Sequence, residues 1–197
     1  MTRPAARRRT TRETSVSVTL DLDGPEGKVH ADTGLPFLDH MLDQLGRHGG
    51  FDLSVDARGD LHVDGHHTVE DVAIVLGEAF REALGDKAGI RRFASGAFPL
   101  DEALVEVALD VSGRPYVAYD VPIGEVLPLG DPPFNPEMAE HFWHSFGGAA
   151  GITLHVRLRT GRNTHHIIEA AFKGVARCLR DAVRIEGGGV PSTKGAL

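Results

Sequence analysis

A short histidine motif occurs twice in this chain, and the repetition limits how the chain can fold. Residues 64–70 read Asp-Gly-His-His-Thr-Val-Glu, and residues 163–169 read Asn-Thr-His-His-Ile-Ile-Glu. Each motif follows another histidine at nearly the same distance, His40 in the first half and His141 in the second. Chance would have to place the pair, the glutamate and the upstream histidine twice at matching spacing. The sequence therefore predicts an internal duplication.

The hydrophobic pattern repeats together with the histidines. The first half predicts, in order, a helix over 36–49, a strand over 51–55, a second strand over 61–63 and a long helix from the His pair to residue 84. The second half predicts a helix over 137–147, a strand over 152–158 and a long helix over 167–183. Each half also opens with an alternating strand, around Val18 and Val107. We expect an α+β fold of two duplicated halves, each a sheet with its helices packed on one face.

The chain length fits one structural domain built from two half-repeats. The 197 residues suit one domain, or two small halves around a shared core. We expect the half-repeats to cover 9–93 and 94–186, with a mobile Arg-rich N-terminus over 1–8 and a C-terminal tail over 187–197 that begins with a mobile Gly187–Gly189 run. The segment 122–136 contains five prolines and is predicted to be an exposed loop.

Composition narrows the class of protein. The formal net charge of −7 argues against a nucleic-acid or membrane-surface partner. No apolar stretch approaches the roughly 18 residues that span a bilayer, and the N-terminus lacks the apolar run of a secretory signal. The single cysteine, Cys178, excludes a disulfide framework and fits a reducing compartment. We therefore expect a cytoplasmic protein.

The position of each His pair decides which side chains can converge. Asp64 and Asn163 are good helix N-caps, which places each pair in the first turn of its long helix. Adjacent helix residues diverge by about 100°, whereas residues three or four apart share a face. The glutamate can approach either histidine of its motif, but the two histidines point apart. We therefore expect two ions, each bound by side chains from more than one helix.

The candidate ligands number enough for two metal ions. They are His40, His66, His67, Glu70, His141, His165, His166 and Glu169. Four ligands per ion would leave about two positions of an octahedral metal open, as a catalytic site requires. Imidazole with carboxylate suits Mn, Fe, Ni or Zn, and composition does not choose among them. The other histidines lack a counterpart in the opposite half and are predicted to be surface or core residues: His30, His48, His62, His144 and His155.

These motifs resemble the imidazoleglycerol-phosphate dehydratase family of histidine biosynthesis. The resemblance covers about residues 9–197 and rests on the stretches 35–45, 64–71, 91–93, 99–104, 112–115, 161–170 and 191–195. Three positions depart from the family's pattern: Thr193 stands where Ser would be expected, Trp143 where Phe would be, and Gly65 where Asp would be. None of the three removes a candidate ligand. Nothing in the chain suggests a fused phosphatase, so the resemblance implies the monofunctional form.

The resemblance implies a reaction, a cofactor and an assembly. It implies two Mn²⁺ per active site and conversion of D-erythro-imidazole glycerol phosphate to imidazole acetol phosphate and water. The metals would act as Lewis acids that hold the substrate ring as an imidazolate. The ring would then expel the hydroxyl to give a diazafulvene-like intermediate, and proton loss would give an enol that becomes the ketone. It also implies a 24-subunit shell with active sites between subunits.

Further roles follow from the resemblance alone. Glu13 is expected near the substrate as a proton-transfer group, and the base is either water on a metal or a carboxylate. The expected catalytic residues are Glu13, His40, Glu70 and Glu169. The substrate phosphate is expected to meet Arg92, Arg114, Ser192 and Lys194. The tail carrying Lys194 is expected to order over bound substrate.

Two other functions remain open at this point. A binuclear hydrolase would also use His and carboxylate ligands, although such sites favour Asp bridges. A metal-storage or structural oligomer would use its ions only to join subunits, which leaves Arg92, Arg114 and Lys194 without a role. The variant Lys194→Ala separates these functions, because only an enzyme that binds a phosphate should lose substrate affinity.

Overall fold

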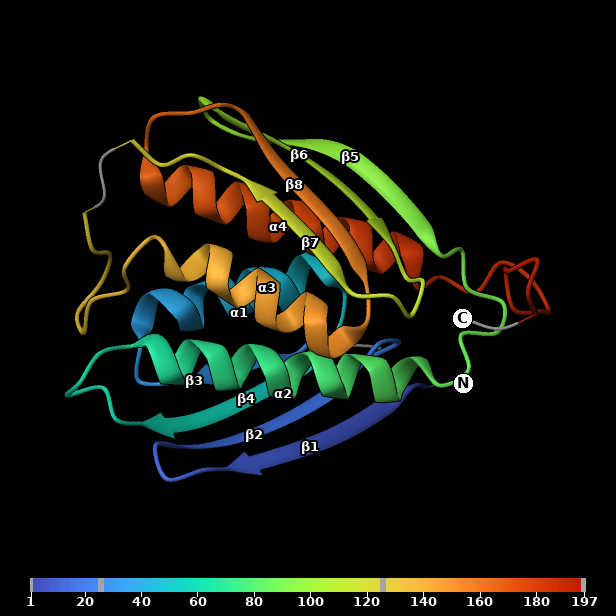
Figure 1. Ribbon diagram of the computed structural model, residues 1–197, viewed down its shortest axis with the longest axis horizontal. Helices are drawn as coiled ribbons and strands as arrows, with labels where there is room; N and C mark the ends of the chain where they lie inside the picture. The colour runs from blue at the N-terminus through green and yellow to red at the C-terminus, as the bar shows by residue number, and fades with distance from the viewer. Residues whose placement is uncertain (1, 25–26, 125–126, 196–197) are drawn as a thin grey trace.

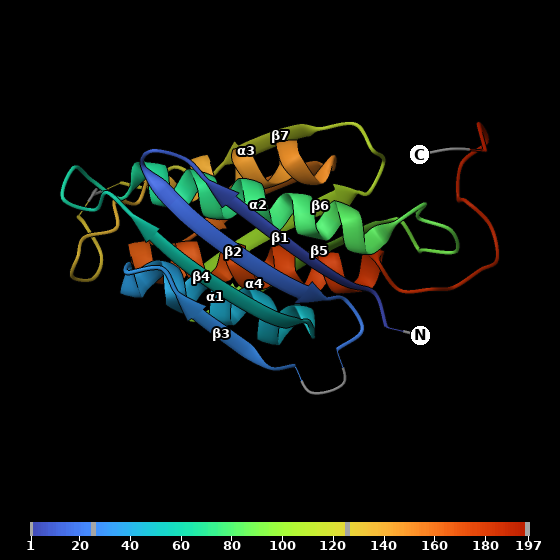
Figure 2. The same ribbon diagram turned by 90° about the horizontal axis from the view of Figure 1, so that it is seen from below.

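The computed structural model describes residues 2–24, 27–124 and 127–195, in which four helices lie between two four-stranded sheets (Figure 1). The first sheet has the order β1-β2-β4-β3, and its face toward the molecule's centre is covered by α1 and α2 (Figure 2). These elements are β1 (Pro4–Thr10), β2 (Thr14–Asp21), β3 (Val29–Asp32), α1 (Pro36–Gly49), β4 (Asp52–Gly59) and α2 (His66–Leu84).

The second sheet repeats the arrangement of the first. Its order is β5-β6-β8-β7, with α3 and α4 packed on its inner face. In both sheets the last strand pair is parallel and the other pairs are antiparallel. The elements are β5 (Phe93–Leu100), β6 (Ala103–Asp110), β7 (Tyr116–Asp120), α3 (Met138–Ala150), β8 (Thr153–Thr160) and α4 (Thr164–Ala182). The predicted α+β duplication is confirmed.

Alternation explains which strand faces enter the core. In β2 the apolar side chains of Val16, Val18 and Leu20 are buried, while the intervening Ser17 is half-buried and Thr19 is exposed. The helices contribute large aromatic side chains between the sheets, and those of Trp143, Phe142, Phe146 and Phe172 are fully buried and in mutual ring contact. Both halves therefore share one core.

Two local predictions were wrong. Residues 61–63 form a turn, closed by a 2.7 Å hydrogen bond from Val63 N to Asp60 O, and not a second strand. The reason is that β4 already pairs with β2 on one edge and β3 on the other, which leaves no edge for a hairpin. The N-terminus predicted as mobile over 1–8 instead enters β1 at Pro4, where it pairs with β2. Residue 1 lies outside the described residues.

The proline-rich segment is less exposed than predicted. Its residues Leu129 and Phe134 exchange two backbone hydrogen bonds of 2.9 and 2.8 Å. The Phe134 side chain is fully buried and lies 5.2 Å from the Phe37 ring, between ring centres. Residues 125–126 of this segment lie outside the described part. The segment therefore packs one aromatic anchor against the start of α1.

Four edge strands that the sequence did not predict complete the sheets: β1, β3, β5 and β7. The β5 sequence includes Gly96 and Pro99, both poor strand residues, and Pro99 is tolerated because β5 is an edge strand. Strands β3 and β7 are short edge strands whose pattern is too brief to detect by alternation. Among the described helices, none is long and apolar enough to cross a membrane.

Candidate metal and substrate site

The two long helices α2 and α4 begin at the repeated His pairs. Asn163 precedes α4, and its side-chain oxygen accepts hydrogen bonds from His165 N at 2.9 Å and His166 N at 3.3 Å. The N-cap position of α2 is occupied by Gly65, so Asp64 lies one residue before the cap. The Asp64 carboxylate nevertheless accepts a hydrogen bond from His66 N at 2.8 Å. Both pairs therefore stand in the first helical turn, as the sequence predicts.

The first group of candidate ligands joins α1 and α4, and we call it the α1–α4 triad. It consists of His40, His165 and Glu169, whose donor atoms lie within 4.8 Å of one another. Glu169 Oε2 is 3.1 Å from His40 Nε2 and 2.9 Å from His165 Nε2. Lys173, one turn further along α4, lies 2.5 Å from Glu169 Oε1. Burial opposes ionisation of this carboxyl, but bonds from Lys173 and the two histidines lower the pKa of Glu169 to about 2.

The second group joins α2 and α3 in the same way, and we call it the α2–α3 triad. It consists of His66, Glu70 and His141, again with donor atoms within 4.8 Å. The His66 and His141 rings stack with centres 4.2 Å apart, and His141 Nε2 lies 3.5 Å from Glu70 Oε1. Burial, together with the neighbouring His66, lowers the pKa of His141, so this ring is neutral near pH 7.

Both triads exchange residues between the halves. The α1–α4 triad takes His40 from the first half and His165 and Glu169 from the second, whereas the α2–α3 triad does the reverse. This exchange follows from helix packing, because α1 packs on α4 and α3 packs on α2 (Figure 1). Neither triad exists until the two halves have packed together.

The triads fit a divalent transition metal. Each offers two imidazole nitrogens and one carboxylate, a donor set that suits Mn, Fe or Zn. In the described chain, His141 Nε2 is buried and has no hydrogen-bond partner, although it faces the other members of its triad. A buried polar atom without a partner is costly, and an ion at this point would satisfy it. Three protein ligands would leave coordination positions open for others.

Two of the eight predicted ligands, His67 and His166, lie outside both triads. His67 Nδ1 is 3.0 Å from Asp60 Oδ2, and His166 Nδ1 is 2.7 Å from Glu102 Oε2. These carboxylates raise the pKa of both histidines. The placement agrees with the expected divergence of adjacent side chains on a helix. Asp60, Glu102 and Lys173 were not predicted; only Lys173 carried a sequence signal, its position four residues after Glu169.

Glu13 lies in the turn between β1 and β2, near one of these outer histidines. Its Oε2 is 3.9 Å from His67 Nδ1, and 55% of its side chain is exposed. It does not contact either triad. The histidines predicted as surface residues also stay outside them; His144, for example, lies 3.6 Å from Glu140 of its own helix.

The four residues predicted to bind phosphate line one cavity of about 530 Å³. Arg92, Arg114, Ser192 and Lys194 share it with Pro191 and Thr193. Arg92 is held by Asp110, with contacts of 2.6 and 3.0 Å, and donates to Pro191 O at 2.7 Å. The tail therefore closes onto Arg92 and brings the hydroxyl and ammonium groups of residues 192 and 194 beside two guanidinium groups.

We call this cavity the phosphate cavity after that prediction. It lies near the C-terminal end of α4, whereas the α1–α4 triad lies at the N-terminal end of this helix. Figure 1 shows how far α4 extends across the molecule. Arg92 N donates to Ala182 O at the end of that helix, whereas His165 is in its first turn. At 1.5 Å per residue, these two points are about 25 Å apart. The substrate that the resemblance implies, an imidazole ring with a three-carbon phosphate chain, is much shorter than this. One chain therefore cannot present both parts to one substrate molecule.

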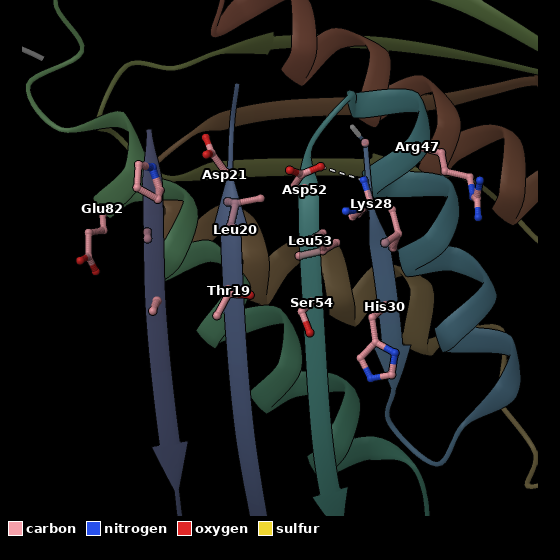
Figure 3. Close-up of a pocket in the computed structure, with 15 residues that line it drawn as sticks. Thr19, Leu20, Asp21, Lys28, His30, Arg47, Asp52, Leu53, Ser54 and Glu82 are labelled. Carbon is pink, nitrogen blue, oxygen red and sulfur yellow. Dashed lines mark hydrogen bonds between the residues drawn. The ribbon is translucent and has the colours of Figure 1, made fainter. Parts of the chain in front are cut away.

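A larger cavity of about 1020 Å³ lies on the outer face of the first sheet (Figure 3). Small side chains such as Thr19 and Ser54 line it, and Lys28, His30 and Asp52 stand around it. Of the helices that carry the triads, α1 and α2 pack on the opposite face of this sheet. No triad residue lines this cavity, and it has no part in the site.

Comparison with known proteins identifies the family of this chain. The family model for imidazoleglycerol-phosphate dehydratase matches residues 33–179, which include both triads. The chain belongs to the imidazoleglycerol-phosphate dehydratase family. Within that family, the enzyme from Acidothermus cellulolyticus is 59% identical over 99% of this chain and 93% of its own. The enzyme from Methanopyrus kandleri is 54% identical over 99% of this chain and 96% of its own.

Solved structures of the family share the fold. The Pyrococcus furiosus imidazoleglycerol-phosphate dehydratase superposes with a TM-score of 0.82 at 36% identity, over 97% of this chain and all of that one. The Staphylococcus aureus structure gives 0.80 at 34% identity, over 91% of this chain and 97% of that one. The family resemblance inferred from the His motifs is thereby confirmed.

Proposed function

We propose that this protein is a metal-dependent, cytoplasmic dehydratase of L-histidine biosynthesis. It would convert D-erythro-imidazole glycerol phosphate to imidazole acetol phosphate and water, with two Mn²⁺ per active site. The observation that carries the proposal is the pair of His₂Glu triads in a chain of this family. The cavity lined by Arg92, Arg114, Ser192 and Lys194 supports a phosphorylated substrate.

The active site would form between copies of the chain. The distance of about 25 Å between the triads and the phosphate cavity supports this, because a second copy that supplied one of them would let one substrate molecule reach both. His67 and His166 point away from their own triads and would complete the ligand sets of other copies, which gives each ion four protein ligands. A 24-subunit shell, as the family resemblance implies, would bring these parts together.

Metal ions bound at the triads would supply Lewis-acid stabilisation of an anionic substrate ring. The protein's own residues would do the rest. His40, His165 and Glu169 on one side and His66, Glu70 and His141 on the other would fix the ring's position. Arg92, Arg114 and Lys194 would hold the phosphate end and so align the three-carbon chain for reaction. The tail that carries Lys194 would cover the substrate and exclude water.

The reaction itself removes one hydroxyl and one proton from adjacent carbons. The carbon attached to the ring loses its hydroxyl, which leaves a diazafulvene-like ring system. The next carbon then loses its proton to give an enol, and the enol takes up a proton to become the ketone. Glu13, exposed and beside His67, would transfer the proton to the enol. Glu70 and Glu169, the carboxylates of the two triads, are the candidates for the base.

The direct test measures imidazole acetol phosphate formed from imidazole glycerol phosphate. Metal-stripped protein should be inactive, and reloading with Mn²⁺ should restore turnover. Absence of product from folded, assembled and Mn²⁺-loaded protein would refute the proposal. Lys194→Ala should raise KM at least tenfold, because a charged hydrogen bond contributes about 1.5–3 kcal/mol. Arg184→Ala is a matched control, since Arg184 does not line the phosphate cavity.

A further inference from the structure

The duplication gives Glu13 a counterpart in the second half. Glu13 immediately precedes β2 in the β1–β2 turn, and Glu102 immediately precedes β6 in the β5–β6 turn. The two sheets have the same strand order and pairing, so these glutamates occupy equivalent positions. Each also faces the second histidine of its motif. Glu102 Oε2 is 2.7 Å from His166 Nδ1, whereas Glu13 Oε2 is 3.9 Å from His67 Nδ1.

Asp60 accounts for this difference. It follows β4 directly, and its carboxylate oxygens lie 3.0 and 3.2 Å from His67 Nδ1. The residue that follows β8 in the second half is Gly161, which has no side chain to offer. The first half thus holds its outer histidine with Asp60 and leaves Glu13 out of hydrogen-bond contact. The second half holds its outer histidine with Glu102.

Both contacts select the same tautomer of the imidazole ring. An ionised carboxylate only accepts hydrogen bonds, so the proton of each ring must be on Nδ1. In a neutral ring, Nε2 then carries the lone pair that a metal ligand needs. Among the described residues, no hydrogen bond engages Nε2 of His67 or His166. Asp101 Oδ2 is 3.8 Å from Nε2 of His166, beyond hydrogen-bond distance.

The Glu102 carboxylate is itself fixed by the backbone. Its Oε1 accepts from Asn163 N at 2.8 Å and from Arg162 N at 3.2 Å, just before α4 begins. Only Oε2 remains for His166. Within the described part of the chain, by contrast, the Asp60 carboxylate accepts only from the ring of His67.

We propose that Asp60 and Glu102 are matched positioning residues, which hold His67 and His166 with Nε2 directed outward as a ligand for an ion in another copy. Asp60 thereby releases Glu13, the counterpart of Glu102, for contact with substrate. This inference rests on the proposed function. It assigns different tasks to two carboxylates that the duplication made equivalent.

The test compares amide substitutions at the two positions. In Asp60→Asn, the amide oxygen can turn toward Nδ1 of His67 and so keep the same tautomer of that ring. In Glu102→Gln, the two backbone donors hold the amide oxygen, so the NH₂ group faces His166 and moves the ring proton to Nε2. We therefore expect Mn²⁺ affinity, measured by calorimetry on the assembled protein, to fall about 10–100-fold in Glu102→Gln and in Asp60→Ala. Asp60→Asn should change it less than about threefold.

Controls separate this arrangement from a loss of charge or of fold. Asp101→Asn removes the adjacent, 74% exposed carboxylate and should leave Mn²⁺ affinity unchanged. Glu13→Gln should also leave Mn²⁺ affinity unchanged while it lowers kcat. Urea unfolding and light scattering of every variant show whether the chain is folded and assembled, and Asp60→Ala provides the test if Glu102→Gln does not fold.

Three outcomes would overturn the inference. One is wild-type Mn²⁺ affinity in both Glu102→Gln and Asp60→Ala. The second is an equal loss of affinity in Asp60→Asn and Glu102→Gln, and the third is a loss in Glu13→Gln as large as that in Asp60→Ala. Failure of the proposed function looks different. In that case the wild-type protein binds Mn²⁺ with the expected variant effects but does not dehydrate the substrate.

Discussion

Helices α2 and α3 pack closely at Gly77, and this contact joins the two helices that form the α2–α3 triad. A Cβ atom added at Gly77 would lie 2.7 Å from Phe146 O, 2.8 Å from Ala149 Cβ and 2.9 Å from Ala150 N. Optimal separations are about 3.5–4.0 Å, so the helices would have to move apart by more than about half an ångström. Two of the three atoms belong to the backbone of α3, which cannot rotate away.

Gly77→Ala should therefore destabilise the protein. Overpacking costs about 1–3 kcal/mol, and rigid backbone neighbours place this site near the upper value. Replacing a helical glycine with alanine returns about 0.5–1 kcal/mol. We expect a net loss of about 2 kcal/mol in unfolding free energy, which for a chain of this size lowers Tm by about 4–8 °C. The separation should also weaken Mn²⁺ binding, because α2 carries His66 and Glu70 and α3 carries His141.

Gly148→Ala is the matched control for this variant. Gly148 is an exposed glycine inside α3, and an added Cβ there meets nothing within 4 Å. Alanine should stabilise this position by about 0.5–1 kcal/mol. Thermal unfolding of the metal-stripped proteins, at equal concentration, compares the two variants. A Tm for Gly77→Ala that equals or exceeds the Tm for Gly148→Ala would refute the close helix contact.

Three further predictions concern the core, acid stability and metal binding. Trp143 is fully buried, and its Nε1 has no hydrogen-bond partner in the described chain. Burying such a donor costs about 1–3 kcal/mol, and its removal in Trp143→Phe should offset the lost packing. We therefore expect Trp143→Phe to change the free energy of unfolding in urea by less than about 1 kcal/mol. Trp143→Ala should cost about 3–5 kcal/mol, and an equal loss in the Phe variant would contradict this reasoning. The pKa of Glu169 is lowered to about 2 in the folded chain, so its stabilising effect is complete above its unfolded pKa near 4.5 and is lost as the pH falls toward 2. As the pH is lowered over this range, the urea midpoint of the metal-stripped protein should therefore fall less steeply in Glu169→Gln than in the wild type. An equal slope in the two proteins would count against an ionised carboxyl at Glu169. Glu70→Ala and Glu169→Ala should each remove one of two Mn²⁺ equivalents measured by elemental analysis, whereas loss of both ions in either variant would show that the triads are not separate sites.

Much of the candidate site was predictable because helix geometry is local. The His-His-x-x-Glu spacing placed one histidine of each pair on the same face as the glutamate, and His165 with Glu169 does form such a pair. The cap residue Asn163 gave the start of α4 correctly. Strands in the middle of a sheet, such as β2 and β4, were predictable from alternation. The edge strands β1 and β3 were not, because a short or basic edge lacks that pattern.

The duplication and the types of ligand follow directly from the sequence, and the divergence of His66 from His67 follows from their adjacent positions on one helix. The packing of α1 on α4 and of α2 on α3 is known only from the folded chain, and this packing makes each triad draw on both halves. The folded chain also places the phosphate cavity about 25 Å from the triads, at the far end of α4. Glu102 likewise reaches His166, 64 residues later in the chain, only because α4 packs on the sheet that contains β5 and β6. The physical reason is that such contacts join residues far apart in the chain, and their pairing is set by how the helices fit between two sheets.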